Sequence, residues 1–273
     1  GVIFMSALHG AKIAIGGKGG VGKTTVCAIL AQQFAKGGYD VLAIDADPDV
    51  NLASAFGIPY EQSPEPLIKM KELIAERTGT GKDTLGAYFK LNPKVSDVPE
   101  EYWHETNGLK LLVLGAITQA GAGCACPEGA FLKALLTHTI LQRKEVVMVD
   151  LAAGVEFMGR ASVQGIDALV LVVEPGARSI ETANNMAQMA KKLGIGCVGA
   201  IVNKVAEAGQ LAVIESQLKD AALLGTLKYS RSLQEADLKR APVFEADAEI
   251  TKELEQAEVR LAELIAMTNN CDS

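Results

Sequence analysis

One run of residues near the N-terminus decides the fold: Gly17-Lys18-Gly19-Gly20-Val21-Gly22-Lys23-Thr24-Thr25. It follows an apolar stretch typical of a strand and opens a segment with helical periodicity, which is the setting of a phosphate-binding P-loop. Glycines allow the backbone to wrap closely around phosphate oxygens, and the first helical turn offers free N–H groups and the positive end of the helix dipole. The predicted phosphate-binding residues are therefore Gly19, Gly20, Val21, Gly22, Lys23, Thr24 and Thr25.

Two side chains of this loop and one acid further along the chain predict how a magnesium nucleotide is bound. Lys23 is expected to bridge the β- and γ-phosphates, and Thr24 to ligate the magnesium ion. The apolar run 146–149 ends at Asp150, which is the arrangement of a Walker B strand, and Asp150 is expected to hold the ion through water. The pattern thus predicts a nucleoside triphosphate or diphosphate with Mg²⁺ as the bound cofactors, and the family resemblance given below implies that the nucleotide is ATP or ADP.

Short apolar runs alternate with helical patterns along the chain. The runs are almost continuously apolar, as expected for strands that are buried on both faces of a parallel sheet. The predicted strands are 12–15, 41–44, 110–114, 146–149, 169–173, 198–202 and 224–227. The predicted helices are 24–36, 66–77, 129–141, 180–193, 210–218 and 249–267. This alternation predicts an α/β fold with a doubly wound, mostly parallel central sheet flanked by helices, in the P-loop NTPase class.

The stretch 59–107 differs from the rest of the chain. It holds most of the prolines and much of the charge, and it lies between the second and third core strands. We interpret it as a helical excursion from the same domain, because no linker or repeat separates it from the flanking strands. Residues 1–273 are therefore predicted to form a single P-loop ATPase domain.

Composition and charge limit the possible partners. The chain is 49% hydrophobic, which is too apolar for intrinsic disorder, and its net charge of -7 disfavours a general nucleic-acid coat. No apolar run reaches the roughly 18 residues of a membrane span, and the amphipathic last helix has an acidic polar face where a membrane-targeting helix carries Lys and Arg. We expect neither a nucleic acid nor a membrane as partner. Five cysteines, scattered except for one close pair, suit a reducing cytoplasm.

The P-loop carries a lysine, Lys18, at a position that the plain motif does not specify. A Gly-Lys-Gly-Gly-x-Gly-Lys-Thr-Thr run resembles the deviant Walker A family, which includes the nitrogenase iron protein and the division-site and chromosome-partitioning ATPases. This resemblance implies an ATP-dependent homodimer in which Lys18 reaches across the interface to the partner's nucleotide. Lys18 and Lys23 are then catalytic lysines.

The same resemblance assigns two further residues. It implies that Asp47, in the run Asp45-Ala46-Asp47-Pro48-Asp49, is the catalytic carboxylate that orients the attacking water. Asp45 could be structural and Asp49 merely exposed. The resemblance also implies that Asn203 contacts the adenine, although an Asn at a strand end is more often a turn former.

A pair of cysteines, Cys124 and Cys126, lies in a glycine-flanked segment. In an extended segment residues i and i+2 face the same side, so both sulfurs can meet one ion. They make half of a tetrahedral thiolate site, and a two-fold axis would supply the other half from a second chain. Soft thiolates suit nickel, zinc, copper(I) or an iron–sulfur cluster. The pair could instead be two buried small hydrophobes or a redox pair, although thioredoxin-like chemistry uses two intervening residues.

Several stretches make the resemblance more specific: 66–71, 78–79, 91–95, 123–128 and 153–156 with Arg160. Together with the P-loop they are similar to the CooC-type ATPases, which load nickel into carbon monoxide dehydrogenase, and to their relatives that serve acetyl-CoA synthase. This implies that Cys124 and Cys126 of two protomers hold one nickel or zinc ion. The chain is thus predicted to be an ATP-hydrolysing, dimerising metallochaperone. The alternatives are a positioning ATPase of the MinD/ParA kind and an iron–sulfur carrier of the nitrogenase iron protein type.

Overall fold

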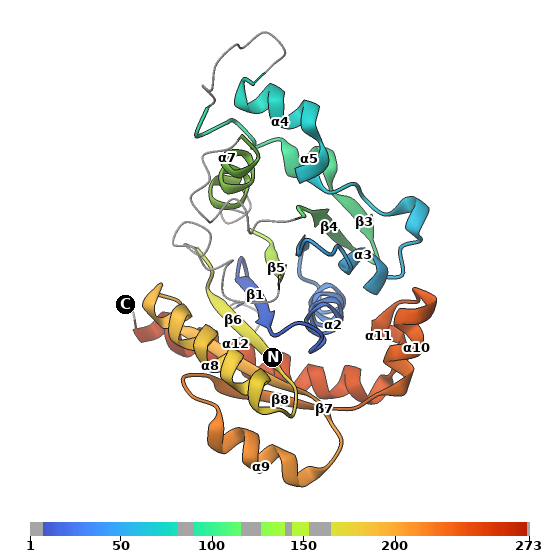
Figure 1. The fold of residues 1–273 in the computed structure, drawn as a ribbon, viewed down its shortest axis with the longest axis vertical. Coiled ribbons are helices and arrows are strands. Elements are labelled where there is room, and N and C mark those ends of the chain that lie inside the picture. The colour runs from blue at the N-terminus through green and yellow to red at the C-terminus, as the bar shows by residue number, and fades with distance from the viewer. Residues whose placement is uncertain (1–7, 81–89, 116–126, 140–143, 153–164, 272–273) are drawn as a thin grey trace.

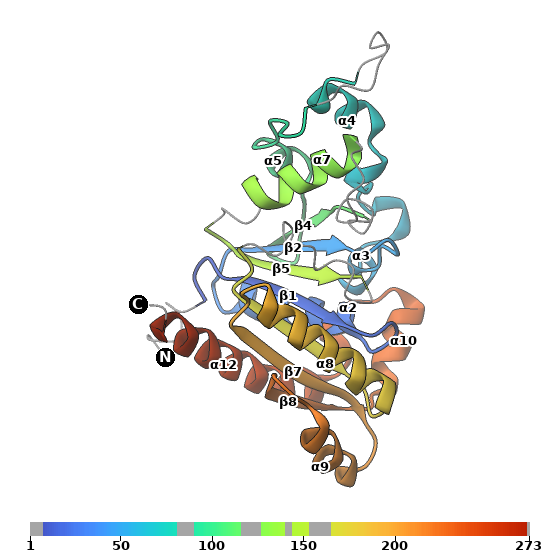
Figure 2. The ribbon, with the colours of Figure 1, turned by 60° about the vertical axis from the view of Figure 1, so that its left-hand side comes forward.

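The structure is a computed structural model that describes residues 8–80, 90–115, 127–139, 144–152 and 165–271. Within this part of the chain one sheet of eight strands has the order β3-β4-β2-β5-β1-β6-β7-β8. The strands are β1 (Lys12–Gly17), β2 (Val41–Ala46), β3 (His104–Thr106), β4 (Leu109–Val113), β5 (Val146–Leu151), β6 (Ala168–Val173), β7 (Cys197–Val205) and β8 (Ala222–Lys228). Neighbours are parallel except for β3, which runs antiparallel to β4 (Figures 1 and 2).

This sheet confirms the predicted α/β fold. All seven predicted strands are present, and the eighth, β3, lies inside the segment that we expected to be helical. It was missed because His104, Glu105 and Thr106 are polar and form a short edge strand, which has no apolar pattern to reveal it. Its pairing depends on β4, where Glu105 lies opposite Lys110.

Most of the predicted helices are present, one is split, and four further helices were not predicted. The helices longer than one turn are α2 (Lys23–Lys36), α4 (Lys71–Thr78), α5 (Val98–Tyr102), α7 (Pro127–Ala134), α8 (Ala177–Lys192), α9 (Ala208–Gln217), α10 (Arg231–Lys239) and α12 (Ala248–Cys271), with single turns at α3 (Leu52–Ala55) and α11 (Val243–Ala246). The predicted helix 66–77 is split into a 3-10 turn, Leu67–Lys69, and α4. The helices α3, α5, α10 and α11 were not predicted: α3, α5 and α11 are too short for a periodicity to stand out, and α10 is largely polar, with only Ala236 buried.

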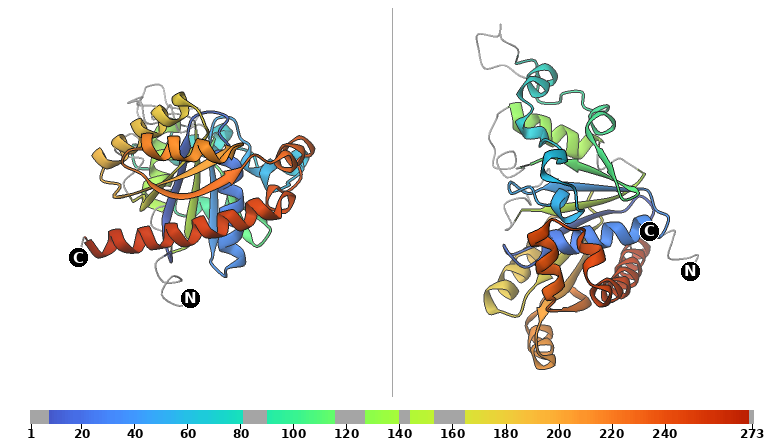
Figure 3. Two further views of the ribbon diagram at one scale, coloured as in Figure 1. Left: turned by 90° about the horizontal axis from the view of Figure 1, so that it is seen from below. Right: turned by 90° about the vertical axis from the view of Figure 1, so that its right-hand side faces the viewer.

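Two layers of helices cover the sheet. Helices α2 and α12 pack on one face, and α4, α7, α8 and α9 on the other. The view from below in Figure 3 shows α12, in red, and α8, in yellow, on opposite sides of the sheet. Alternate residues of a strand therefore enter different cores: Met148 of β5 packs beneath α2, while Val147 and Val149 pack on the opposite side. Burial on both faces explains why the strands are continuously apolar in sequence.

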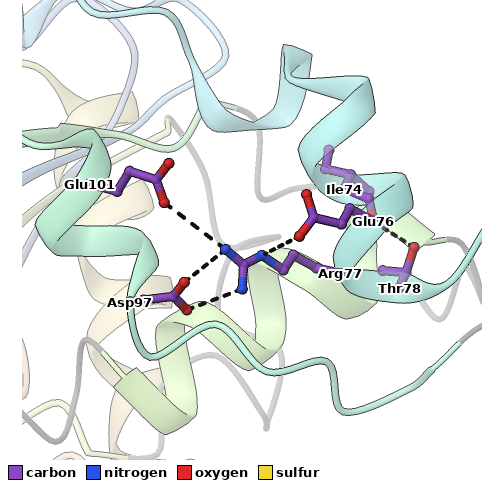
Figure 4. A network of polar contacts seen from close by, with 6 residues as sticks. All are labelled: Ile74, Glu76, Arg77, Thr78, Asp97 and Glu101. Atoms are coloured by element: carbon purple, nitrogen blue, oxygen red, sulfur yellow. Dashed lines mark hydrogen bonds and ion pairs between the residues drawn. The ribbon is translucent and has the colours of Figure 1, made fainter.

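The segment between β2 and β4 packs first against α2, where Leu52 and Phe56 are buried, and from Leu67 onward on the second face of the sheet. Leu67, Leu73 and Val98 belong to the same buried cluster as strand residues of β2 and β5. A polar network ties its two longer helices together: the Arg77 guanidinium of α4 donates to both carboxylate oxygens of Asp97, at 2.8 and 3.2 Å (Figure 4). Such a bidentate pair fixes direction as well as distance, so α4 and α5 hold one orientation at the edge of the sheet.

Within the described part of the chain, no helix combines the length and the apolar character that crossing a bilayer requires.

Candidate functional site

A cavity of about 700 Å³ lies at the carboxyl edge of the sheet. Strand β1 stands between β5 and β6, so the chain order reverses there, and ligands of open α/β sheets bind at such a reversal. The predicted residues that line the cavity are Gly19, Gly20, Gly22, Lys23, Thr24, Thr25, Asp47 and Asn203. The fold thus brings together segments from three separate parts of the sequence.

The P-loop leaves β1 through a turn that requires glycine at two positions. Gly17 has φ +143°, and a Cβ there would lie 2.4 Å from the carbonyl oxygen of Val172. Gly22 has φ +97° and immediately precedes α2. No side chain caps the N-terminus of α2, and its first turn contains no acid. Its N–H groups are thus left for a ligand, and both they and the helix dipole favour an anion such as a phosphate.

Lys23, the first residue of α2, is largely buried. Lys23 is 7% exposed, and its Nζ lies 3.5 Å from the carbonyl oxygen of Lys18. Lys18 is half-buried, and Val21 is fully buried; neither is among the described residues that line the cavity. In this single chain Lys18 therefore belongs to the P-loop but does not line the cavity.

Thr24 and Asp150 meet behind the cavity. The Thr24 hydroxyl donates to Oδ2 of Asp150 at 2.6 Å, and the other oxygen, Oδ1, is buried without a partner among the described residues. Burial raises the pKa of Asp150 to about 8, although the hydrogen bond from Thr24 acts in the opposite direction. A hydroxyl and a carboxylate with a free oxygen are hard ligands, and a divalent cation would compensate the buried charge, so the pair fits Mg²⁺.

The three acids after β2 have different surroundings. Asp45 is fully buried, and its carboxylate accepts hydrogen bonds from the backbone N–H groups of Asp47, Asn51 and Leu52 at 2.9–3.2 Å. Burial raises its pKa to about 6 against the effect of these hydrogen bonds. Asp47 and Asp49 both line the cavity; Asp47 is half-buried and Asp49 is exposed. Asp45 thus anchors the loop that carries Asp47.

Asn203, at the end of β7, binds the P-loop itself. Its Nδ2 donates to the carbonyl oxygen of Val21 at 2.8 Å, and its Oδ1 accepts from the N–H of Lys204 at 2.9 Å. The side chain is 7% exposed and forms part of the cavity wall. Asn203 thus lies within β7, which continues to Val205, and makes a contact to the P-loop that the sequence did not reveal.

The far wall of the cavity was not predicted. It consists of the end of β8, one face of α10 and the start of α11: Lys228, Tyr229, Ser230, Leu233, Gln234, Asp237 and Val243. Ser230 caps α10 by accepting from the N–H of Leu233, and the Tyr229 hydroxyl donates to Gln234 at 2.8 Å. The available signal was the position of this segment after the last parallel strand, since all such strands end at the same edge.

The cysteine pair lies outside the described residues, as do Glu156 and Arg160 of the stretches that suggested the family. Among the described residues no cluster of three or more His, Cys, Asp or Glu side chains could hold a metal. Cys27 and Cys197 are free and buried, and burial raises the pKa of both thiols, that of Cys197 to about 12. A thiol that stays protonated is a poor ligand and nucleophile, so both belong to the core.

Comparison with known proteins relates this site to a family. The family described as CobQ/CobB/MinD/ParA nucleotide binding domain matches residues 12–243. The carbon monoxide dehydrogenase accessory protein CooC of Rhodospirillum rubrum is 44% identical over 228 residues, which cover 83% of this chain and 86% of that protein.

Solved structures show the same fold. A chain of the MinC:MinD cell division protein complex of Aquifex aeolicus superposes with a TM-score of 0.67 at 19% identity and covers 93% of this chain, with 96% of its own length matched. The septum site-determining protein MinD of Pyrococcus horikoshii, solved with Mg-ADP, gives 0.64 at 20% identity, over 96% of this chain and 98% of its own. At this identity the likeness supports the fold alone.

Proposed function

The chain belongs to the CobQ/CobB/MinD/ParA nucleotide-binding family and, within it, to the relatives of CooC, and from this premise we propose that it is an ATP-driven nickel chaperone. It is a P-loop ATPase. Its ATP hydrolysis would drive the insertion of nickel into carbon monoxide dehydrogenase or acetyl-CoA synthase. Residues 1–273 would act as one domain, and the segment 59–107 as its excursion. The free buried thiols Cys27 and Cys197 suit a reducing compartment, and we assign the protein to the cytoplasm.

Hydrolysis in this proposal uses residues of the cavity. Lys23 and the N-terminus of α2 would bind the β- and γ-phosphates, and Thr24 with Asp150 would hold Mg²⁺, whose charge would favour the negative charge on the phosphates. Asp47 orients the attacking water, and the carboxylate of Asp45 keeps its loop in place. Asn203 and the far wall receive the adenosine, where Tyr229 offers an aromatic surface. Lys18 acts on the nucleotide of a partner subunit.

One observation carries the link between nucleotide and metal: Asp45 holds two loops at once. Its carboxylate accepts from Asp47, Asn51 and Leu52 on the nucleotide side. Its carbonyl oxygen accepts from the N–H groups of Leu114 and Gly115, at 2.8 and 3.3 Å. Leu114 begins the segment that leads from β4 to the cysteine pair. A change in the conformation of the Asp47 loop on ATP hydrolysis would therefore be transmitted by Asp45 to Leu114 and Gly115, which precede the cysteine pair in sequence.

The second end of that segment supports the same proposal. Helix α7 begins at Pro127, directly after Cys126 in sequence, and its buried residues, among them Phe131, pack into the core beneath β2 and β5. A helix start lowers the pKa of nearby thiols and so favours the thiolate that binds metal. Two thiolates from each of two chains complete a tetrahedral site, so we propose that the cargo ion and ATP both favour the homodimer.

The test is a titration of Ni²⁺ into the reduced, metal-free protein, with thiolate-to-metal absorption and molecular mass followed together. We expect saturation at about one ion per two chains, as four thiolates per ion require, and a dimer that forms with the ion. The double variant Cys124→Ser/Cys126→Ser should lose both signals. The matched control is Cys271→Ser, which removes a thiol at the C-terminal end of α12 and should leave both unchanged.

The outcomes separate the alternatives. Two results together would indicate a structural metal site: Zn²⁺ binds as tightly as Ni²⁺, and the protein does not transfer Ni²⁺ to nickel-free carbon monoxide dehydrogenase. A brown protein with visible absorption after anaerobic purification would favour an iron–sulfur carrier. ATP-dependent binding to liposomes or DNA would favour a positioning ATPase. Binding that does not depend on Cys124 and Cys126 would overturn the nickel proposal and leave the ATPase in place.

A further inference from the structure

The P-loop has a second, outer side that a nucleotide does not contact. Its N–H groups turn inward toward phosphate, so carbonyl oxygens of the same peptides turn outward. Backbone carbonyl oxygens in a folded protein need hydrogen-bond donors. A loop lacks the regular backbone hydrogen bonds of a helix or sheet, so other parts of the chain must supply these donors. The carbonyl oxygens of Gly20 and Val21 have their donors at the end of β7, more than 180 residues further along the chain, whereas that of Gly22 accepts from the N–H of Val26 in α2.

Two consecutive side chains supply these donors. Asn203 donates from Nδ2 to the carbonyl oxygen of Val21, and Lys204 donates from Nζ to the carbonyl oxygen of Gly20. The Asn203 amide also fills the space beside Gly22, where a Cβ would lie 2.5 Å from Nδ2. The pair thus holds three successive residues of the loop from behind.

The backbone of Lys204 is arranged for this contact. It has φ +59°, a left-handed conformation that side chains other than glycine rarely adopt. The Lys204 N–H donates to Oδ1 of Asn203, so each residue orients the other. Glu174, at the end of β6, lies 3.5 Å from the Lys204 ammonium and balances its charge. A strained backbone that the surroundings hold in place is common where function depends on position.

We propose that Asn203 and Lys204 form a clamp that sets the shape of the anion cradle, with Lys204 as a positioning residue for nucleotide binding. By holding the carbonyl oxygens of Gly20 and Val21, the clamp keeps the N–H groups of those peptides directed at the phosphates before a nucleotide arrives. Lys204 also lines the cavity, but its ammonium is paired with Glu174 and with the carbonyl oxygen of Gly20, so its expected effect is to hold the loop in place. The clamp concerns ATP binding, so it is independent of the metal that the protein carries.

The test compares variants of Lys204 in equilibrium binding of ATP and ADP and in steady-state hydrolysis. Lys204→Met removes the ammonium and should raise the Kd of both nucleotides about tenfold, the effect of losing one charge-assisted hydrogen bond. The KM for ATP should rise while kcat stays within about twofold, because the clamp acts before the chemical step. Lys204→Arg keeps the cation and should restore most of the affinity. Lys192→Met, an exposed lysine of α8 outside the cavity, is the matched control.

Two further results discriminate between mechanisms. Lys204→Gly relieves the left-handed backbone but lacks the ammonium, so it should bind as weakly as Lys204→Met while melting at an equal or higher temperature. Since the clamp shapes the part of the loop that surrounds the β-phosphate, ATP and ADP should weaken by the same factor. Weakening of ATP alone would mean that Lys204 contacts the γ-phosphate directly and would overturn the proposal. Parental affinity in Lys204→Met and Lys204→Gly would also overturn it.

Discussion

At the carboxyl edge of the sheet the chain buries Lys23 and Asp150, whereas beneath α12 it buries Leu254, Leu261 and Ile265. Both regions lie against the same sheet, but one buries charged side chains and the other buries apolar side chains. At the edge, an oxygen of Asp150 has no partner among the described residues, and its pKa is raised to about 8. Beneath α12, the side chains of Leu254, Leu261 and Ile265 are apolar and bring no polar atom that needs a partner. The buried charged groups at the edge destabilise the protein without a ligand and would be stabilised when a ligand binds. Apolar packing beneath α12 offsets this cost.

The largest expected effect falls on activity and not on stability. Lys23→Ala removes the cation that meets the phosphates and should lower kcat/KM for ATP by about 1,000-fold, or about 4 kcal/mol of transition-state stabilisation. Because Lys23 is a buried cation whose nearest partner is a carbonyl oxygen at 3.5 Å, the melting temperature without nucleotide should not fall. A variant that unfolds more easily and hydrolyses ATP normally would contradict the contrast between the regions.

The opposite pattern is expected beneath α12. Leu254 is fully buried between α12 and the sheet, so Leu254→Ala should cost about 3 kcal/mol of unfolding free energy through the lost contacts and the cavity left behind. Denaturant unfolding measures this loss. At a temperature where the variant is folded, its KM for ATP should equal that of the parent; a large rise in KM would show that α12 also shapes the nucleotide site.

Glycine substitutions separate backbone strain from steric conflict at the edge. Gly22→Ala places a methyl group 2.5 Å from Nδ2 of Asn203 at φ +97°, whereas Gly38→Ala has a similar φ of +89° and meets nothing within 4 Å. We expect about 2 kcal/mol of destabilisation for Gly22→Ala and about 1 kcal/mol for Gly38→Ala, measured by chemical denaturation. Only Gly22→Ala should also weaken ATP binding. Equal effects of the two variants on binding would be inconsistent with a P-loop held from behind.

The smallest effect concerns an acid on the α12 face. Burial, with repulsion from Glu255, raises the pKa of Glu258 from 4.5 to about 7. The folded state holds this proton more tightly than the unfolded state, so the associated stability is complete below about pH 4.5 and is lost as the pH rises through 7. Glu258→Gln cannot ionise and should be about 1 kcal/mol more stable than the parent at pH 8, with equal stability near pH 4; the value is small because Glu258 is only partly buried.

Thermal unfolding at both pH values tests this expectation. Glu215→Gln, an exposed acid of α9, is the control and should show no such pH dependence. A gain in Glu258→Gln that is the same at both pH values would mean that packing, and not ionisation, is responsible.

The sequence by itself determined the features that depend on short contiguous runs of residues. The P-loop is one contiguous run, Asp150 follows its own strand, and each core strand is an apolar run that can be recognised without knowledge of its neighbours. For this reason the parallel sheet, the nucleotide and the residues Lys23 and Thr24 could be predicted, and Thr24 indeed lies 2.6 Å from Asp150. The roles of Asp45, Asp47 and Asp49 could be assigned only in part from the sequence. Asp45 is buried and Asp49 is exposed, and this difference cannot be read from the sequence run itself.

The tertiary structure decided what depends on the order of the strands. The contact of Asn203 with Val21, the strained backbone of Lys204 and the far wall around Tyr229 all arise because β7 and β8 end at the same edge as β1. The two loops that Asp45 holds meet only because β2 pairs with β4. Such contacts join residues that are far apart in the chain, and no local pattern specifies them. Their donors and acceptors acquire partners only when the sheet has assembled.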